Sequence, residues 1–281
     1  MLALMNAVNS HATSMGHVLS SSSWLDAHFG SCRAEYTEML SWAGIEPGAR
    51  VLDAGCGTGS YVSLLHDAKA TQVVALDAAM ENIATLAQHW PLDACLPVCG
   101  VMASLPFRDY EFDAVWCANT LQYLDDAEAL DAVRECARVV RPGGLIAVKD
   151  VDMTAFKISP APPFLGLHLA ESCVAGDDMT AQSRGSIRGR VLYDYLQRAG
   201  LSAIRQRSFV IDRFGPLSGL DARFWSEWLT YLAGVARGLP LPQEDQETWE
   251  QVSTPAEAEA FVSRPNFYGC ELQVVAMGVR L

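Results

Sequence analysis

Residues 51–59, Val-Leu-Asp-Ala-Gly-Cys-Gly-Thr-Gly, place three alternate glycines between an apolar strand-like run and a helical run. Glycines at such a turn let the backbone approach a ligand closely, and the N-terminus of the next helix favours a negative group. Asp77 closes the following apolar run, 24 residues after Asp53, where a carboxylate can accept both hydroxyls of a ribose. The alternative is a plain turn with a capping aspartate. The spacing favours a strand–loop–helix unit that binds a nucleotide.

Apolar runs alternate with helical runs after this loop, which indicates a parallel sheet with helices on both faces. We expect core strands at 49–54, 71–76, 94–98, 113–118 and 145–151, and helices at 61–68, 80–89 and 127–140. After residue 152 the pattern predicts helices at 164–174 and 190–199, strands at 201–212 and 272–279, and further helical segments within 214–264. The predicted fold class is α/β, a doubly wound and mostly parallel sheet.

The chain is expected to divide into a core and two cap insertions. A flexible N-terminal arm is predicted for 1–23 and a helical segment for 24–48, followed by a cofactor-binding core at 49–152. The first cap insertion is expected at 153–186, and the core continues at 187–213. The second, helical insertion at 214–266 precedes the final core strand at 267–281.

Composition excludes several classes of partner. Half of the 281 residues are hydrophobic, so the chain can bury a large core, and its formal net charge of -13 disfavours nucleic acid and anionic membrane surfaces. No apolar run is long enough to span a bilayer, and the start lacks a signal-peptide pattern. The eight cysteines are scattered without a Cys-x-x-Cys pair, which favours buried free thiols over disulfides or zinc. We therefore expect a cytoplasmic protein with a small-molecule partner and no metal; a homodimer stays open.

Three more motifs follow the glycine loop in order. They are LPFRDYEFD at 105–113, ANTLQYL at 118–124 and RVVRPGG at 138–144. Together with the loop and Asp77, they resemble the ordered motifs of class I S-adenosylmethionine-dependent methyltransferases over residues 50–151. The chain is most similar to the branch that acts on quinones, natural products and other small molecules. The resemblance implies a Rossmann-like, seven-stranded sheet and S-adenosylmethionine as cofactor.

The resemblance also implies a cofactor site. The glycine-loop residues Asp53, Gly55, Cys56, Gly57 and Gly59 would line the methionine part of the cofactor. Asp77 would hold the ribose, and Ala78 and Met80 would border the adenine. Met102 and Ala103 would meet the adenine edge through backbone groups, Asn119 would lie beside the methionyl amino group, and Tyr36 would reach the carboxylate.

No catalytic signature is evident, and none is required. Orientation alone supplies roughly 7–11 kcal/mol, whereas a general base adds about 10²–10⁴-fold. His28 and His168 are the candidate bases, and the alternative for each is a partly buried helix histidine. Candidate substrate-binding residues are Asp150 and Asp152 at the end of the fifth strand, Arg33 on the first helix, and the cap tryptophans Trp225 and Trp228. The alternative is loop capping for the two aspartates, surface exposure or core packing for the arginine, and core packing for the tryptophans.

These features predict methyl transfer to a small hydrophobic or aromatic acceptor, such as a natural product or a quinone-like metabolite. Oxygen is favoured over nitrogen or carbon, because residues 119–122 replace the prolyl-proline tetrapeptide of amino and nucleobase N-methyltransferases. One alternative is a repurposed protein that binds the cofactor without transferring methyl. An NAD(P)-dependent oxidoreductase is disfavoured by Ser60, where a dinucleotide fingerprint has its last glycine. An RNA or protein methyltransferase is disfavoured by the charge and the cap.

Overall fold

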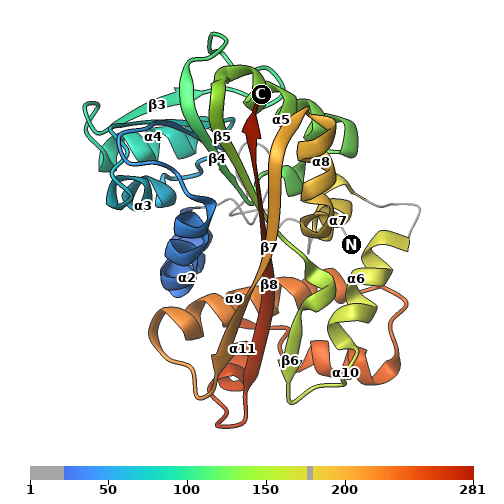
Figure 1. Cartoon of the computed structure of the whole chain (residues 1–281). Coiled ribbons are helices and arrows are strands. Elements are labelled where there is room, and N and C mark those ends of the chain that lie inside the picture. The colour runs from blue at the N-terminus through green and yellow to red at the C-terminus, as the bar shows by residue number, and fades with distance from the viewer. Residues whose placement is uncertain (1–21, 176–179) are drawn as a thin grey trace.

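A computed structural model describes residues 22–175 and 180–281, so the arm predicted for 1–23 lies almost wholly outside the described residues. The core elements follow one another in strand–helix alternation (Figure 1). They are β1 (Arg50–Ala54), α3 (Ser60–Asp67), β2 (Gln72–Asp77), α4 (Met80–His89), β3 (Cys95–Cys99), β4 (Phe112–Ala118), α5 (Asp126–Val139), β5 (Val140–Val151), α8 (Leu192–Arg198), β7 (Leu201–Phe214) and β8 (Tyr268–Arg280).

One sheet runs through the molecule in the order β3-β2-β1-β4-β5-β8-β6, with β7 also paired to β8. The β1, β2, β3, β4 and β5 strands pair in parallel, and β8 is antiparallel to its three neighbours. This confirms the predicted α/β fold. The sheet has eight strands instead of seven, because the short β6 (Lys157–Ser159) of the first insertion pairs with β8.

The parallel strands are apolar because helices cover both of their faces. In β1, all residues after Arg50 are buried, and β2 is buried from Val73 to Leu76.

The α5 helix begins with a capping box: the Asp125 carboxylate accepts hydrogen bonds from the backbone N–H groups of Ala127 and Glu128, each at 2.8 Å. The Glu128 carboxylate accepts in turn from the Asp125 N–H at 3.0 Å. These bonds explain why the helix starts where it does.

The capping box gives a stability prediction. Asp125→Ala removes the acceptor for two otherwise unpaired N–H groups, so we expect the free energy of unfolding to fall by about 0.5–2 kcal/mol. Urea denaturation of the variant would measure the loss. The matched control is Asp131→Ala, which removes an exposed carboxylate from the middle of the same helix and should change stability by less than about 0.5 kcal/mol. Equal losses in both variants would contradict the capping role.

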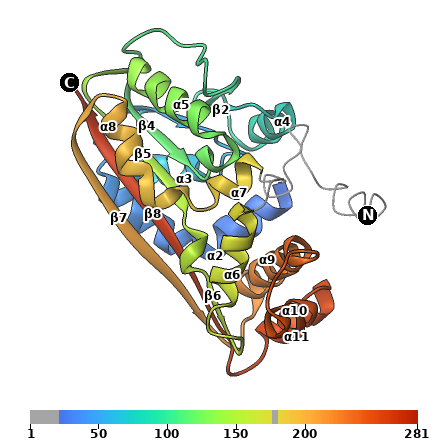
Figure 2. The ribbon, with the colours of Figure 1, turned by 90° about the vertical axis from the view of Figure 1, so that its right-hand side faces the viewer.

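The cap contains more than the two predicted insertions. Its helices are α2 (Ser22–Ala43), α6 (Leu165–Ala175), α7 (Ala181–Gly185), α9 (Gly219–Ala236), α10 (Gln243–Glu250) and α11 (Pro255–Val262). The insertions pack on each other, since the rings of Phe156 and Trp228 lie 5.0 Å apart. The N-terminal α2 also joins them, because the ring of Trp24 lies 5.4 Å from that of Phe224 on α9. Figure 2 shows these helices gathered on one side of the long β7 and β8 strands.

The β7 and β8 strands connect the core to the cap. Residues 273–279 of β8 pair with β5 in the core, whereas residues 268–270 pair with β6, beyond the end of β5. The two strands remain paired through this extension, which reaches the cap helices (Figure 1). Side chains in this part of β8 can therefore face the space between core and cap.

Candidate active site

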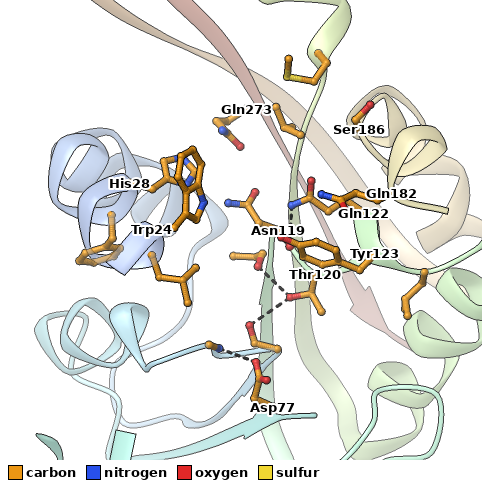
Figure 3. A pocket seen from close by; sticks show the side chains of 18 of the residues that line it. Trp24, His28, Asp77, Asn119, Thr120, Gln122, Tyr123, Gln182, Ser186 and Gln273 are labelled. Atoms are coloured by element: carbon orange, nitrogen blue, oxygen red, sulfur yellow. Dashed lines mark hydrogen bonds between the residues drawn. The ribbon is translucent and has the colours of Figure 1, made fainter. Parts of the chain in front are cut away.

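A cavity of about 500 Å³ lies between the carboxyl ends of the core strands and the cap. Figure 3 shows Asp77 at one end, Gln273 at the other, Trp24 and His28 of α2 on one side and Gln182 of α7 on the opposite side. A cleft beyond the carboxyl ends of parallel strands is where open α/β sheets bind ligands. The cavity therefore lies where the sequence predicted the cofactor.

The conformation of the glycine loop depends on the positive φ angles of its glycines and on hydrogen bonds to Asp77. The loop glycines have positive φ, +77° at Gly55 and +54° at Gly57, a region that side-chain-bearing residues rarely adopt. A Cβ atom on Gly55 would lie 2.2 Å from the Thr120 hydroxyl oxygen. The Gly57 N–H donates to one Asp77 oxygen at 2.8 Å, and the Ala79 N–H donates to the other at 2.9 Å. Asp77 therefore fixes the loop as well as facing the cavity.

A buried lysine supports the middle of the cavity wall. The Lys149 ammonium donates to the side-chain oxygens of Asn119 at 2.8 Å and Gln273 at 2.7 Å. It also lies 4.4 Å from the centre of the Tyr36 ring, within reach of a cation–π interaction. Burial lowers the pKa of Lys149 to about 8, although the charge of Glu271 acts in the opposite direction. Lys149 thus orients two cavity side chains without lining the cavity itself.

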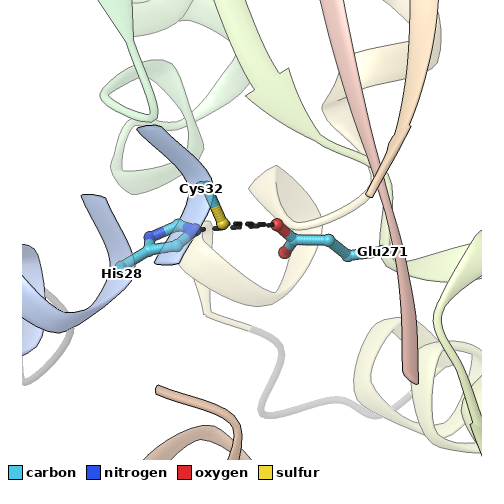
Figure 4. A group of neighbouring side chains, drawn as sticks. All are labelled: His28, Cys32 and Glu271. Carbon is cyan, nitrogen blue, oxygen red and sulfur yellow. Dashed lines mark hydrogen bonds and ion pairs between the residues drawn. The ribbon is translucent and has the colours of Figure 1, made fainter. Parts of the chain in front are cut away.

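His28 belongs to a polar cluster at the cap side of the cavity, shown with Cys32 and Glu271 in Figure 4. Its Nε2 atom lies 2.7 Å from the Tyr36 hydroxyl oxygen and 3.8 Å from Glu271 Oε1. The Cys32 thiol donates to Glu271 Oε1 at 3.5 Å. Burial raises the pKa of Glu271, but His28 and Lys149 outweigh this effect and hold it below its usual value. The glutamate is therefore an ionised, buried carboxylate.

The same three side chains offer metal-ligand atoms within 4.8 Å of one another, which one ion could bridge. Burial and the charge of Glu271 raise the pKa of the Cys32 thiol, so this ligand stays protonated in the structure described. The hydrogen bonds and the ion pair above account for the cluster as it stands. The expectation that the site uses no metal remains a prediction.

Aromatic rings form the cap wall, which we call the acceptor side: Trp24, His28, Phe224, Trp228 and Tyr231, together with Glu271. The imidazole of His28 stacks on Phe224 with centroids 4.6 Å apart and planes 7° apart. Phe224 in turn stacks with Trp228 at 5.4 Å. Such faces suit a flat apolar ligand.

Many of the predicted residues line this cavity. On the cofactor side they are Tyr36, Gly55, Cys56, Gly57, Asp77, Ala78, Met102 and Asn119, and on the acceptor side they are His28 and Trp228. The structure thus brings together residues from the first helix, the loop, three strand ends and α9. Their roles remain predictions, since the geometry shows placement only.

Four predicted cofactor residues do not line the cavity: Asp53, Gly59, Met80 and Ala103. Asp53 points into the core, where burial and the charge of Asp77 raise its pKa to about 8. Gly59 is buried at the start of α3, and its Cβ would lie 2.6 Å from Leu86. The side chain of Met80 is 59% exposed at the first residue of α4, and Ala103 is also exposed. Their neighbours Ala78, Ala79 and Met102 line the cavity instead.

His168, predicted as a base, does not line the cavity. Its Nδ1 atom lies 2.6 Å from a carboxylate oxygen of the buried Asp245, so it joins α6 to α10 within the cap. Its sequence position gave no sign of this pairing, because the partner lies 77 residues further along the chain. The alternative considered from the sequence, a partly buried helix histidine, describes it correctly.

Four predicted substrate residues also lie away from the cavity: Arg33, Asp150, Asp152 and Trp225. The Arg33 guanidinium faces α3, with Asp67 at 3.5 Å. Asp150 is fully buried beneath the sheet end, and Asp152 pairs with Arg190 at 2.8 Å. Trp225 packs in the cap core beside Phe267, with centroids 5.8 Å apart. An exposed ion pair accounts for Arg33, capping and an ion pair for Asp152, and packing for Trp225. Asp150 keeps one carboxylate oxygen without a hydrogen-bond partner among the described residues, and burial raises its pKa to about 7.

Sequence reasoning missed several lining residues, among them Trp24, Thr120, Gln122, Glu271 and Gln273. The last two lie on the final strand, whose extension beyond β5 cannot be read from an apolar pattern. Alternation offered one signal: Glu271 and Gln273 are two residues apart in a strand and share a face. A carboxylate and an amide on one face of an otherwise apolar strand suggest a polar cavity.

The described residues fit S-adenosylmethionine. Asp77 accepts three hydrogen bonds from the protein, and a carboxylate has about four acceptor sites, so capacity remains for a ribose hydroxyl. A Cβ atom on Gly55 would overlap the side chain of Thr120, and one on Gly57 would lie 2.7 Å from Leu25, so both glycines leave room beside these two cavity residues. The fold and this site together define a cofactor-binding domain of the class I methyltransferase type.

Comparison with known proteins agrees. Residues 52–148 match the family model described as a methyltransferase domain, so this part of the chain is such a domain. The chain is 34% identical over 119 residues to a chloroplastic 2-phytyl-1,4-beta-naphthoquinone methyltransferase of Arabidopsis thaliana, covering 40% of this chain and 45% of that protein. It is 35% identical over 99 residues to a malonyl-[acyl-carrier protein] O-methyltransferase of Enterobacter lignolyticus, covering 35% and 38%. The chain thus spans less than half the length of these two relatives.

Among solved structures, the chain is similar to a phosphoethanolamine N-methyltransferase 2 of Haemonchus contortus in complex with S-adenosyl-L-methionine. The TM-score is 0.56 at 12% identity, over 95% of this chain and 59% of that one, which shows a shared fold. Together these findings confirm the predicted fold, the family resemblance, and a methyltransferase domain whose family uses S-adenosylmethionine. Among the residues described, no helix has the length and apolarity needed to cross a membrane.

Proposed function

We propose that this protein transfers a methyl group from S-adenosylmethionine to a small aromatic or otherwise hydrophobic acceptor, at oxygen in preference to nitrogen or carbon. The observation that carries the proposal is that the glycine loop, Asp77 and the aromatic acceptor side all line the same cavity. A cofactor bound at the loop and Asp77 would lie against a flat apolar molecule bound at the acceptor side. We expect a cytoplasmic location, and a homodimer stays open.

The relatives support this acceptor class to different degrees. One is named for a naphthoquinone ring and the other for a malonyl group on a carrier protein. Stacked rings such as Phe224 and Trp228 suit the ring better than a short flexible acid. We therefore favour a quinone-like or other aromatic natural product.

S-Adenosylmethionine supplies an activated methyl group when bound, so the chain's own task is binding and orientation. Asp77 would hold the ribose, the loop backbone the methionine part, and Asn119, fixed by Lys149, the amino group. His28 is the group best placed to take a proton from the acceptor, because it stands in the cap wall. Glu271, at 3.8 Å, would stabilise the imidazolium that results.

A labelled-methyl screen tests the proposal. The purified protein is incubated with methyl-deuterated S-adenosylmethionine and a panel of hydroquinones, phenols, arylamines and aromatic carbon nucleophiles. We expect at least one phenol or hydroquinone to gain one labelled methyl group, with an equal amount of S-adenosylhomocysteine, as measured by mass spectrometry. Cofactor binding without transfer to any panel member would instead favour the non-methylating alternative. Absence of cofactor binding would contradict the site itself.

A further inference from the structure

Among the residues described, the surface of the cavity has acidic side chains and no basic side chain of permanent charge. Three acidic residues line it, Asp77, Glu128 and Glu271, and no Lys or Arg does so among residues 22–175 and 180–281. The sequences of 1–21 and 176–179 contain no Lys or Arg either. An anionic ligand would therefore find no permanently charged cation at the cavity surface.

Glu271 is the acid on the acceptor side. It lies on the part of β8 that extends past β5, where it pairs with Ile211 of β7. Only 2% of the residue is exposed, yet it lines the cavity. Its carboxylate is contacted by Cys32, His28 and the Gln273 amide, and the buried Lys149 ammonium acts on it from behind Gln273. None of these groups is a permanent cation at the cavity surface. Protonated His28 and Glu271 form a neutral pair, and with neutral His28 the pair is negative, so its net charge is never positive.

Lys149 cannot serve an anionic ligand in place of a lining cation. The residue is 1% exposed and lies behind the wall formed by Tyr36, Asn119 and Gln273. Its ammonium already donates to two of these side chains, at 2.8 and 2.7 Å. Reaching it would require breaking the contacts that orient Asn119.

We propose that the site selects its acceptor by charge. It takes uncharged aromatic molecules and rejects molecules of the same shape that carry a carboxylate, phosphate or sulfate, with Glu271 as the specificity-determining residue. This inference rests on the proposed function, because it concerns the acceptor of that reaction. An anion entering here loses its hydration, touches no permanent cation of the described residues, since Lys149 lies behind the wall, and meets the Glu271 carboxylate. An uncharged ring loses little hydration and gains the aromatic faces of the acceptor side.

Matched pairs of ligands test this selection without requiring the natural acceptor. Isothermal titration would compare benzamide with benzoate and 2-naphthamide with 2-naphthoate, because each pair has one shape and differs in charge. The protein is saturated with S-adenosylhomocysteine, which lacks the sulfonium charge that could attract an anion. One of the two carboxamides will bind more tightly than the other. We expect the affinity of that carboxamide to be at least about 10-fold higher than the affinity of the carboxylate of the same shape, since like charges in a desolvated site repel strongly.

Variants locate the selection. Glu271→Gln keeps the shape of the side chain and should reduce the difference within a pair to about 3-fold or less, since the repelling charge is gone. The control Glu38→Gln removes the same charge from an exposed position on α2 and should leave the difference unchanged. If Glu271→Gln does not fold, the wild-type comparison still decides the charge preference.

Two results would overturn the proposal: equal or tighter binding of the carboxylates, or no binding by either carboxamide. A preference that persists unchanged in folded Glu271→Gln would overturn the role of Glu271. S-Adenosylhomocysteine binding is measured first in every sample, so failure of the cofactor site is recognised separately from failure of charge selection.

Discussion

Asp77→Ala is expected to weaken S-adenosylhomocysteine binding by about 10- to 100-fold, because a hydrogen bond to a charged group contributes about 1.5–3 kcal/mol. The structure adds a second reason in the same direction. The carboxylate also accepts from the Gly57 and Ala79 N–H groups at 2.8 and 2.9 Å, so its removal frees the loop that would hold the methionine part. Isothermal titration with S-adenosylhomocysteine measures the loss.

The control for this variant is Asp67→Ala, which removes an exposed carboxylate from the end of α3. It should bind S-adenosylhomocysteine as the wild type does. Thermal unfolding of each protein shows whether the variants are folded. A folded Asp77→Ala protein with unchanged affinity would refute the assignment of Asp77 to the ribose.

The core could be predicted from the sequence because its signals are local. The apolar runs of β1 and β2 are short, continuous and separated by helices, a pattern that few arrangements other than a parallel sheet satisfy. The loop has positive φ at Gly55, Gly57 and Gly59, a conformation that glycine adopts most readily, so the alternate glycines in the sequence predict the shape of the loop. The α4 helix begins at Met80 and ends at His89, as predicted.

The acceptor side could not be predicted, because its contacts join distant segments. His28 meets Glu271 across 243 positions of sequence, and which side of α2 faces the cavity depends on how α9 packs against it. The cap tryptophans show the same limit: Trp225 and Trp228 are one helical turn apart, yet the first is core and the second lines the cavity. Helical periodicity identifies the apolar face of a helix, but it does not tell which residues of that face pack in the core and which line the cavity.

His168 is a titratable group that is a candidate base from the sequence but has a structural role in the cap. Its carboxylate partner Asp245 is fully buried, and a buried carboxylate needs a hydrogen-bond donor or a positive charge. The histidine is therefore explained by the joint between α6 and α10. His28 also has buried polar partners, Tyr36 at 2.7 Å and Glu271 at 3.8 Å, but unlike His168 it lines the cavity.

His28→Ala is therefore expected to lower kcat by about 100-fold, within the range that a general base contributes, once an acceptor is known. Affinity for S-adenosylhomocysteine should stay near that of the wild type, because the loop and Asp77 are untouched. The control His89→Ala removes an exposed histidine from the end of α4 and should keep full activity. Steady-state kinetics with the acceptor found by the labelled screen measure both variants.

The two measurements together separate the possible roles of His28. A loss of kcat at constant cofactor affinity supports proton transfer or alignment of the acceptor near the methyl group. Added imidazole tells these apart, because a small base that enters the emptied space can restore proton transfer but cannot restore the stacking on Phe224. If folded His28→Ala keeps most of its kcat, the imidazole is not the base, and orientation of the acceptor by the aromatic wall suffices for the reaction.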